Sequence, residues 1–150
     1  SYIDLAQIEG GVILTGGSRE MTGYYGPEGI GAYLRPTVVD KLPHTSRCAT
    51  EEIFGPMVTL HSFTTEHEVL EMINQSEYGL AGSVWTSNLQ RGQQFAQQIE
   101  SGIVWVNTWL HRDLRTPFGG VKNSGVGREG GQWSLDFFSE LTNICVKETS

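Results

Sequence analysis

A chain of 150 residues is long enough to bury one core of ordinary size, and its 38% hydrophobic and 18% charged residues are typical of a globular protein. The formal net charge of −7 argues against a nucleic-acid partner, because an acidic surface repels phosphate. No apolar run approaches the ~20 residues that a membrane helix needs, so no membrane partner is expected.

The first part of the chain predicts a helix followed by extended segments. Residues 2–8 carry periodic apolar side chains and are followed by Gly10 and Gly11, which is typical of a helix end. Residues 12–14 are expected to form a short strand. A glycine-rich loop is then expected over residues 21–31, and an extended segment over residues 32–39.

In the middle of the chain, three predicted strands alternate with two predicted helices. The strands are expected at residues 57–63, 81–86 and 103–107. Thr65 and Glu68 have the spacing of a capping box at the start of the first helix, and Asn88 can cap the second. Short connections between such units predict an α/β fold, with a parallel sheet, right-handed crossovers and helices on its faces.

The end of the third predicted strand is where we expect chemistry. Ligands of parallel sheets gather at the carboxyl ends of the strands, which directs attention to Asn107 and the loop over residues 108–127. A last helix is expected over residues 129–138, followed by an extended tail over residues 142–147.

Residues 125–130 fit the glycine pattern of dinucleotide-binding loops. That pattern is informative only when a buried strand runs directly into its first glycine. Here a polar loop, residues 119–124, precedes it. We therefore interpret the segment as a turn into the last helix and not as a pyrophosphate site.

The segment Glu51 to Pro56 has two interpretations from its residues alone. The plainer one is a surface loop whose Phe54 docks on the core. In the other, a carboxylate accepts two hydrogen bonds from a sugar diol beside an apolar wall for an aromatic ring.

The cysteines and histidines predict neither a disulfide scaffold nor a metal site. The chain has two cysteines, Cys48 and Cys145, which lie far apart. A two-cysteine chain of this size is not a disulfide scaffold, which favours a reducing compartment. The four histidines show no ligand spacing with cysteines or carboxylates.

Four sequence blocks in this order resemble the C-terminal portion of the aldehyde dehydrogenase superfamily. They are EEIFGP at 51–56, YGLAGSVWT at 78–86, IVWVN at 103–107 and TPFGGVKNSGVGREGG at 116–131. The resemblance extends from Tyr2 to Lys147. It implies part of that family's parallel-sheet, three-layer catalytic domain over residues 1–140. It also implies an oligomerisation tail over residues 141–150, with a strand that makes homo-oligomer contacts.

The resemblance also implies roles for individual residues. Glu52 matches the glutamate that holds the nicotinamide ribose of NAD or NADP, and Phe54 matches the aromatic residue beside the nicotinamide. Phe118 matches a residue that lines the site near the catalytic thiol.

The loop over residues 107–117 resembles that of 2-hydroxymuconate and 2-aminomuconate semialdehyde dehydrogenases, whose substrates already carry a carboxylate. Arg112 is therefore expected to grip a carboxylate with two parallel hydrogen bonds, and Arg115 is the alternative. The competing interpretation is that Arg112 is an exposed loop arginine, for which Asp113 is a candidate partner. Trp109 is expected to form either an apolar wall of the substrate tunnel or part of the core, and Asn107 to contact the substrate.

The residues that perform the family's chemistry are not expected within this chain. The family nucleophile is a cysteine in a Gly-Gln-x-Cys context, which is absent, and Cys48 occupies an ordinary position of the family. We expect a part of a longer cytoplasmic enzyme, a view that Ser1 in place of an initiator methionine favours, and we expect no activity from this chain alone. The alternative is a natural short homologue that acts in binding or assembly.

Overall fold

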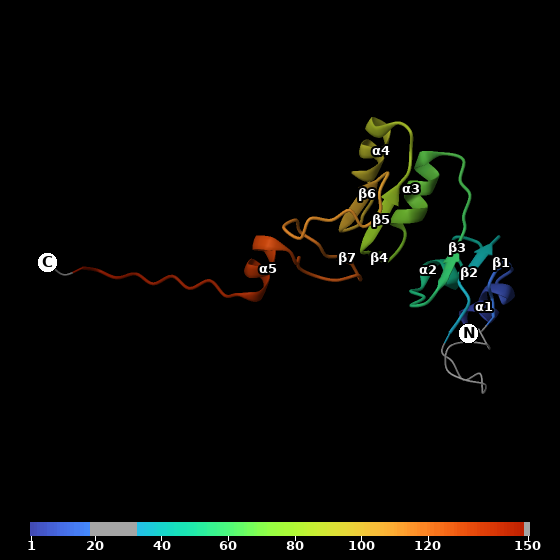
Figure 1. Cartoon of the computed structure of the whole chain (residues 1–150), viewed down its shortest axis with the longest axis horizontal. Coiled ribbons are helices and arrows are strands. Elements are labelled where there is room, and N and C mark those ends of the chain that lie inside the picture. The colour runs from blue at the N-terminus through green and yellow to red at the C-terminus, as the bar shows by residue number, and fades with distance from the viewer. Residues whose placement is uncertain (19–32, 149–150) are drawn as a thin grey trace. The chain divides into compact units, whose positions relative to one another are not determined.

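The computed structural model describes residues 1–18 and 33–148, so the glycine-rich loop predicted over residues 21–31 lies outside the described residues. The chain divides into two compact units, Ser1–Val69 and Leu70–Ser150, and each is described by itself. Helix α3 (Glu66–Asn74), labelled in Figure 1, contains residues on both sides of this division.

The first unit combines two helices with a three-stranded sheet. Its elements are α1 (Tyr2–Ile8), β1 (Val12–Thr15), β2 (Thr37–Asp40), α2 (Arg47–Thr50) and β3 (Met57–Thr59). Strand β2 lies in the centre, antiparallel to β1 and parallel to β3. The predicted helix over residues 2–8 and the predicted strand after it are both confirmed.

The core of the first unit lies where α1, β2 and α2 meet. Ala6, Val39, Leu42 and Cys48 are buried there. Gly11 allows this close packing, because a Cβ at that position would lie 2.8 Å from both the Ala6 carbonyl oxygen and a Val39 methyl group.

The second unit is built from short strands and three helices, α3 included. Its elements after α3 are β4 (Tyr78–Gly79), β5 (Ala81–Val84), α4 (Leu89–Ala96), β6 (Ile103–Val106), β7 (Val121–Lys122) and α5 (Gly131–Phe138). Strands β5 and β6 are parallel, and α4 connects them and packs against both. Strands β4 and β7 form an antiparallel pair.

The α/β class is confirmed, but the strand pairing differs from the simplest expectation. The predicted parallel pairing of residues 81–86 with residues 103–107 is found in β5 and β6. The predicted strand over residues 57–63 is shorter, and it pairs with β2 instead of joining β5 and β6. The expected single sheet is therefore several small sheets, because β2 and not β5 satisfies the backbone of β3.

Both predicted helix starts are confirmed by their hydrogen bonds. The Thr65 hydroxyl accepts a bond from the Glu68 backbone N–H at 3.2 Å, and the Glu68 carboxylate accepts the Thr65 N–H at 3.4 Å. Asn88 caps α4, because its side-chain oxygen accepts the Arg91 N–H at 3.0 Å.

The chain beyond α5 has no regular secondary structure over residues 139–148, and every side chain there is exposed. Leu141 is 99% exposed, and Ile144 and Val146 are about four-fifths exposed. Figure 1 shows this tail as an extended trace that runs away from α5. None of the described helices has the length and apolar character required to cross a membrane.

Candidate functional site

The loop between α2 and β3 presents the two residues predicted to hold a cofactor. Glu52 and Phe54 are exposed, and Phe54 is 98% exposed. The plainer expectation that Phe54 docks on the core is wrong, because Ile53 packs against the core cluster instead. Alternate side chains of this loop thus face inward and outward, which leaves a carboxylate and an aromatic ring together on the outer side.

The carboxylate of Glu52 makes no hydrogen bond or ion pair with any residue that the structure describes. Its neighbour Glu51 receives the local donors, which come from Tyr2 and Arg47. The sequence offered a signal for this pairing that was missed, since Arg47 and Glu51 have the i, i+4 spacing of a helical ion pair.

Cys48 lies inside the first unit and not at a reactive surface. Its side chain is buried, and its thiol donates to the Tyr2 carbonyl oxygen at 3.6 Å. Burial, followed by the hydrogen bond and negative charge of Glu9, raises the pKa of the Cys48 thiol to about 11. The thiol therefore stays protonated at neutral pH and is a poor nucleophile.

Timed alkylation with iodoacetamide at neutral pH should modify the exposed Cys145 and leave Cys48 untouched in the folded chain. Labelling of Cys48 should rise only as the pH approaches the raised pKa of its thiol, because only the thiolate reacts. Peptide mass spectrometry measures both sites, with Cys145→Ser as the control that isolates Cys48. Equal labelling of the two thiols at neutral pH would contradict the buried assignment.

In the second unit, Asn107 lies directly after β6 and joins the ends of the two parallel strands. Its side-chain oxygen accepts the Thr86 N–H at 2.8 Å, and its side-chain nitrogen donates to the Thr86 carbonyl at 2.7 Å. Its backbone has a φ of 55°, which asparagine tolerates better than most residues. Asn107 therefore shapes the start of the following loop, and its contact with a substrate stays a prediction.

Two tryptophans organise that loop. Trp105 on β6 is buried, and its indole N–H donates to the His111 carbonyl at 2.8 Å. The ring of Trp109 meets that of Trp105 edge-on, with centroids 4.9 Å apart. Trp109 is 57% exposed, so of its two predicted roles a place in the core is wrong, and an apolar wall stays a prediction.

Arg112 and Arg115 have different partners in the structure. Arg115 forms a two-pronged pair with Asp113, including an Nε to Oδ1 distance of 2.9 Å. Arg112 instead donates from Nη2 to Glu129 Oε1 at 3.1 Å. Arg112 is exposed, as the competing interpretation expects, but its partner is Glu129 and not Asp113.

The Arg112 guanidinium also lies over the ring of Phe118, with its central carbon 4.2 Å from the ring centroid. Phe118 and Glu129 face each other across an antiparallel bridge with two backbone hydrogen bonds of 2.8 Å. The bridge brings the ring and the carboxylate to the same guanidinium. Arg112 and Phe118, two of the four predicted substrate residues, are thus in contact.

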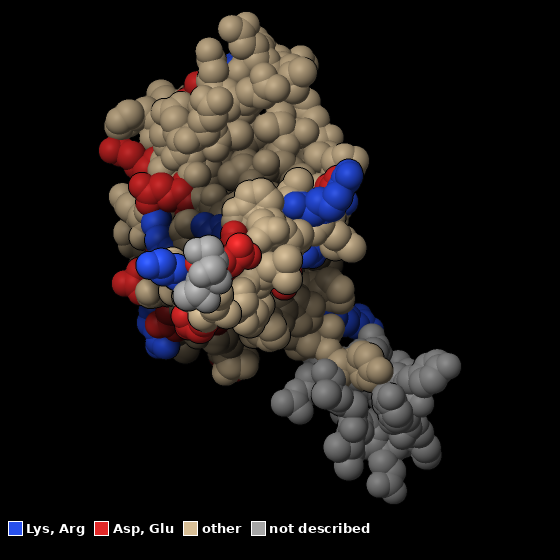
Figure 2. All heavy atoms as spheres, turned by 90° about the vertical axis from the view of Figure 1, so that its left-hand side faces the viewer, with Lys and Arg blue, Asp and Glu red and all other residues tan. Residues whose placement is uncertain are grey.

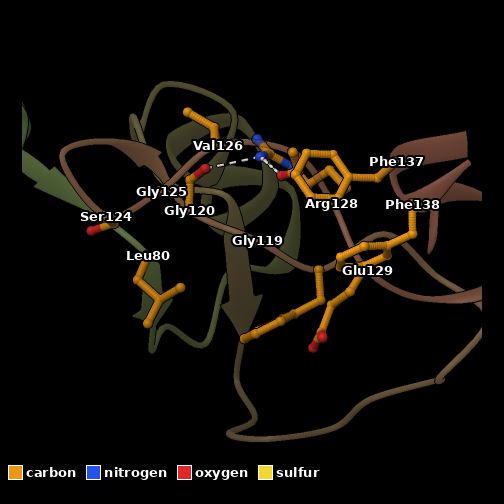
Figure 3. Close-up of a pocket in the computed structure, with 12 residues that line it drawn as sticks. Leu80, Gly119, Gly120, Ser124, Gly125, Val126, Arg128, Glu129, Phe137 and Phe138 are labelled. Atoms are coloured by element: carbon orange, nitrogen blue, oxygen red, sulfur yellow. Dashed lines mark hydrogen bonds between the residues drawn. The ribbon is translucent and has the colours of Figure 1, made fainter. Parts of the chain in front are cut away.

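A hollow of about 370 Å³ lies beside this bridge, with Leu80, Phe118, Glu129, Phe137 and Phe138 among its lining residues (Figure 3). Arg128 also lines it, but its guanidinium donates to the carbonyls of Gly120 and Gly127, as the dashed lines show.

Residues 125–130 form the predicted turn into the last helix. Gly125, Gly127 and Gly130 all have positive φ angles, and the only element directly before them is the two-residue strand β7. A side chain at Gly127 would overlap the ring of Phe137, which gives a packing reason for that glycine.

The charged side chains of the chain are mixed in sign. Figure 2 shows acidic and basic residues intermingled among uncharged ones on the face that it presents.

Within residues 1–18 and 33–148, no group of three or more histidine, cysteine, aspartate or glutamate side chains could hold a metal ion.

Comparisons with known proteins identify relatives along almost the whole chain. Residues 1–144 match the model of the aldehyde dehydrogenase family. The 2-hydroxymuconic semialdehyde dehydrogenase of Pseudomonas putida is 49% identical over 98% of this chain, and the 2-aminomuconic semialdehyde dehydrogenase of Homo sapiens is 44% identical over 98% of it. In both cases this chain spans 30% of the relative's length.

Solved structures show the same likeness. An indole-3-acetaldehyde dehydrogenase of P. syringae, in complex with NAD+ and IAA, superposes with a TM-score of 0.86 and 36% identity over 94% of this chain and 28% of its own. The NAD+ complex of an aldehyde dehydrogenase from Bacillus cereus gives a TM-score of 0.83 and 38% identity over 93% of this chain and 27% of its own.

Proposed function

The chain belongs to the aldehyde dehydrogenase family, and from that premise we propose that it forms the C-terminal part of an NAD(P)-dependent enzyme that oxidises a carboxylated semialdehyde to the acid. The position of Arg112 is the observation that supports the proposal most directly. Its guanidinium is stacked on Phe118 and keeps one exposed ion pair, with Glu129, that a substrate carboxylate can replace. The names of the similar semialdehyde dehydrogenases of Pseudomonas putida and Homo sapiens support this substrate class.

The residues of the α2–β3 loop fit a nicotinamide cofactor. Glu52 has a carboxylate without a partner among the described residues, which suits the two hydroxyl groups of a ribose. Phe54 offers an uncovered aromatic face to the neighbouring ring. The bound cofactor would supply the hydride acceptor of the oxidation, and these two residues would hold and orient it.

The substrate end of the proposed site lies on the loop after β6. Arg112 would bind the carboxylate of the semialdehyde, while Phe118 and Trp109 would line the path to the aldehyde group. Asn107 would fix the start of this loop through its bonds to Thr86, and we assign it to the substrate site on that basis. Such positioning matters because a misplaced reacting group slows the chemistry steeply.

The nucleophilic cysteine of the reaction would come from sequence outside these 150 residues. The Gly-Gln-x-Cys context is absent, and the buried Cys48 has a raised pKa. The purified 150-residue chain should therefore show no aldehyde-dependent reduction of NAD or NADP, while the full-length gene product should show it with a carboxylated semialdehyde. Activity of the short chain that disappears in Cys48→Ser would overturn this assignment.

The intact mass of the gene product in its source cells separates the two candidate proteins. A mass well above 16.6 kDa supports a longer dehydrogenase. A mass near 16.6 kDa favours the alternative, a short homologue that acts in binding or assembly.

We also propose that residues 141–150 form an oligomerisation tail, separate from the catalytic portion over residues 1–140. Leu141, Ile144 and Val146 are exposed along it, and apolar side chains in such a row favour a partner. Deletion of the tail should lower the oligomeric mass of the full-length protein in light scattering. An unchanged oligomeric mass would contradict a role of the tail in the oligomer interface.

The free cysteines are compatible with a cytoplasmic enzyme.

A further inference from the structure

Glu51 is the most extensively hydrogen-bonded carboxylate near the proposed cofactor loop, and it directly precedes Glu52. Its Oε2 atom accepts the Tyr2 hydroxyl at 2.8 Å. Arg47 donates to its two oxygens, from Nε at 2.6 Å and from Nη2 at 3.1 Å. These donors come from α1 and α2, so the residue before Glu52 is attached to both helices. We refer to Tyr2, Arg47 and Glu51 as the Glu51 cluster.

The two helices that carry the Glu51 cluster are themselves connected. The carboxylate of Glu9, at the end of α1, accepts the backbone N–H groups of Arg47 at 3.0 Å and of Cys48 at 3.3 Å. Cys48 is buried in the core between the helices. Helix α1 and its cap therefore contact both ends of α2. Glu9 binds the start of α2, and Tyr2 binds Glu51 directly after it, which gives Glu51 a rigid support.

The backbone at Glu51 is extended, with a φ of −90° and a ψ of 150°. In extended backbone, successive side chains point to opposite sides. Glu51 is half-buried and held by its hydrogen bonds, and Ile53 is half-buried and packs against the core. Glu52 and Phe54, which alternate with them, are exposed. The anchored residues on either side of Glu52 thus determine where its carboxylate points.

We propose that Glu51, held by Tyr2 and Arg47, is a positioning residue that orients Glu52 toward the cofactor ribose. The inference rests on the proposed function, and Glu51 itself contacts no cofactor in this scheme. A carboxylate with a fixed direction can accept two bonds from a diol without first losing conformational freedom.

The ionisation of the Glu51 cluster agrees with this geometry. The hydrogen bonds from Arg47 and then from Tyr2 hold the pKa of Glu51 below its ordinary value. The hydrogen bond to Glu51 also raises the pKa of the Tyr2 hydroxyl. At neutral pH, Glu51 is therefore ionised while Tyr2 keeps the proton that it donates.

The test uses Glu51→Gln and the milder Tyr2→Phe in the full-length protein. Each should raise the KM for NAD or NADP, by about tenfold for Glu51→Gln and about threefold for Tyr2→Phe, and leave the KM for the aldehyde unchanged. Glu68→Gln is the matched control. Its carboxylate also accepts several hydrogen bonds, from Thr64 and Thr65, but it caps α3 and should not change the cofactor KM.

A double-mutant cycle separates positioning from general stability. In a Glu52→Gln background, Glu51→Gln should not raise the cofactor KM further, because Glu51 acts on the cofactor only by orienting the Glu52 carboxylate. Thermal melting establishes whether each variant is folded. If Glu51→Gln does not fold, Tyr2→Phe replaces it in the same test. An unchanged cofactor KM in a folded variant, or an equal effect in the Glu52→Gln background, overturns the positioning role. A wild-type cofactor KM in Glu52→Gln alone instead overturns the proposed ribose contact on which that role rests.

Discussion

Replacing Arg112 by alanine should raise the KM for a carboxylated semialdehyde far more than the KM for a simple aldehyde of similar size. Loss of one partner from a desolvated charge pair costs ~2–5 kcal/mol, which corresponds to a loss of binding between ~30-fold and a few thousandfold. The Arg112 side chain is 35% exposed, so the lower end of this range is expected. Steady-state kinetics on the two substrates measure the difference.

Arg115→Ala is the matched control for this prediction. Arg115 lies on the same loop, but its guanidinium is paired with Asp113 and its side chain is 87% exposed. We expect it to leave the preference for the carboxylated substrate unchanged. Arg112→Lys should recover only part of the loss, because lysine keeps the charge but not the planar fork. Equal increases of both KM values in Arg112→Ala would exclude Arg112 as the residue that binds the substrate carboxylate. A selective increase for the carboxylated substrate in Arg115→Ala would assign that role to Arg115.

Glu52→Gln should weaken cofactor use strongly in the full-length enzyme. A glutamine offers one neutral acceptor where the carboxylate offers two charged ones, and a bond to a charged group is worth ~1.5–3 kcal/mol. We therefore expect kcat/KM for the cofactor to fall by ~10- to 150-fold. A larger isotope effect with a deuterated aldehyde would show that hydride transfer has become slower. Cofactor kinetics identical to those of the wild type would exclude Glu52 as the ribose ligand.

Phe54→Ala provides the companion measurement for this loop. Since Phe54 is 98% exposed, its removal should leave the melting temperature of the 150-residue chain unchanged. In the full-length enzyme, the same change should lower cofactor affinity if the ring packs beside the nicotinamide. A loss of stability in the short chain would show that the ring has a structural contact in that chain.

Local chemistry in the sequence predicted most of the helices. The capping box of Thr65 and Glu68 and the cap at Asn88 are found as expected, because each depends on residues three positions apart. The parallel pairing of β5 and β6 was also predictable, since one helix connects two adjacent strands. The four sequence blocks identified the family, which the family match over residues 1–144 confirms.

The candidate site was predicted in part. The contact between Arg112 and Phe118 joins two residues that the sequence singled out separately. Glu129, which pairs with Arg112, was missed, because the bridge that brings it close joins positions 118 and 129 across a glycine-rich turn. Tyr2 was missed as a partner of Glu51 for a similar reason, since 49 positions separate them.

The sequence alone determined the family, the helix starts, the parallel pair around α4 and the turn at residues 125–130. These depend on short spacings that a linear pattern contains. Only the tertiary structure decided that β3 pairs with β2, that Ile53 and not Phe54 enters the core, and that Arg112 pairs with Glu129 and not Asp113. Every strand edge offers the same backbone donors and acceptors, and every exposed arginine can bind any carboxylate within reach. The choice among such equivalent partners is made by which of them the folded chain brings together.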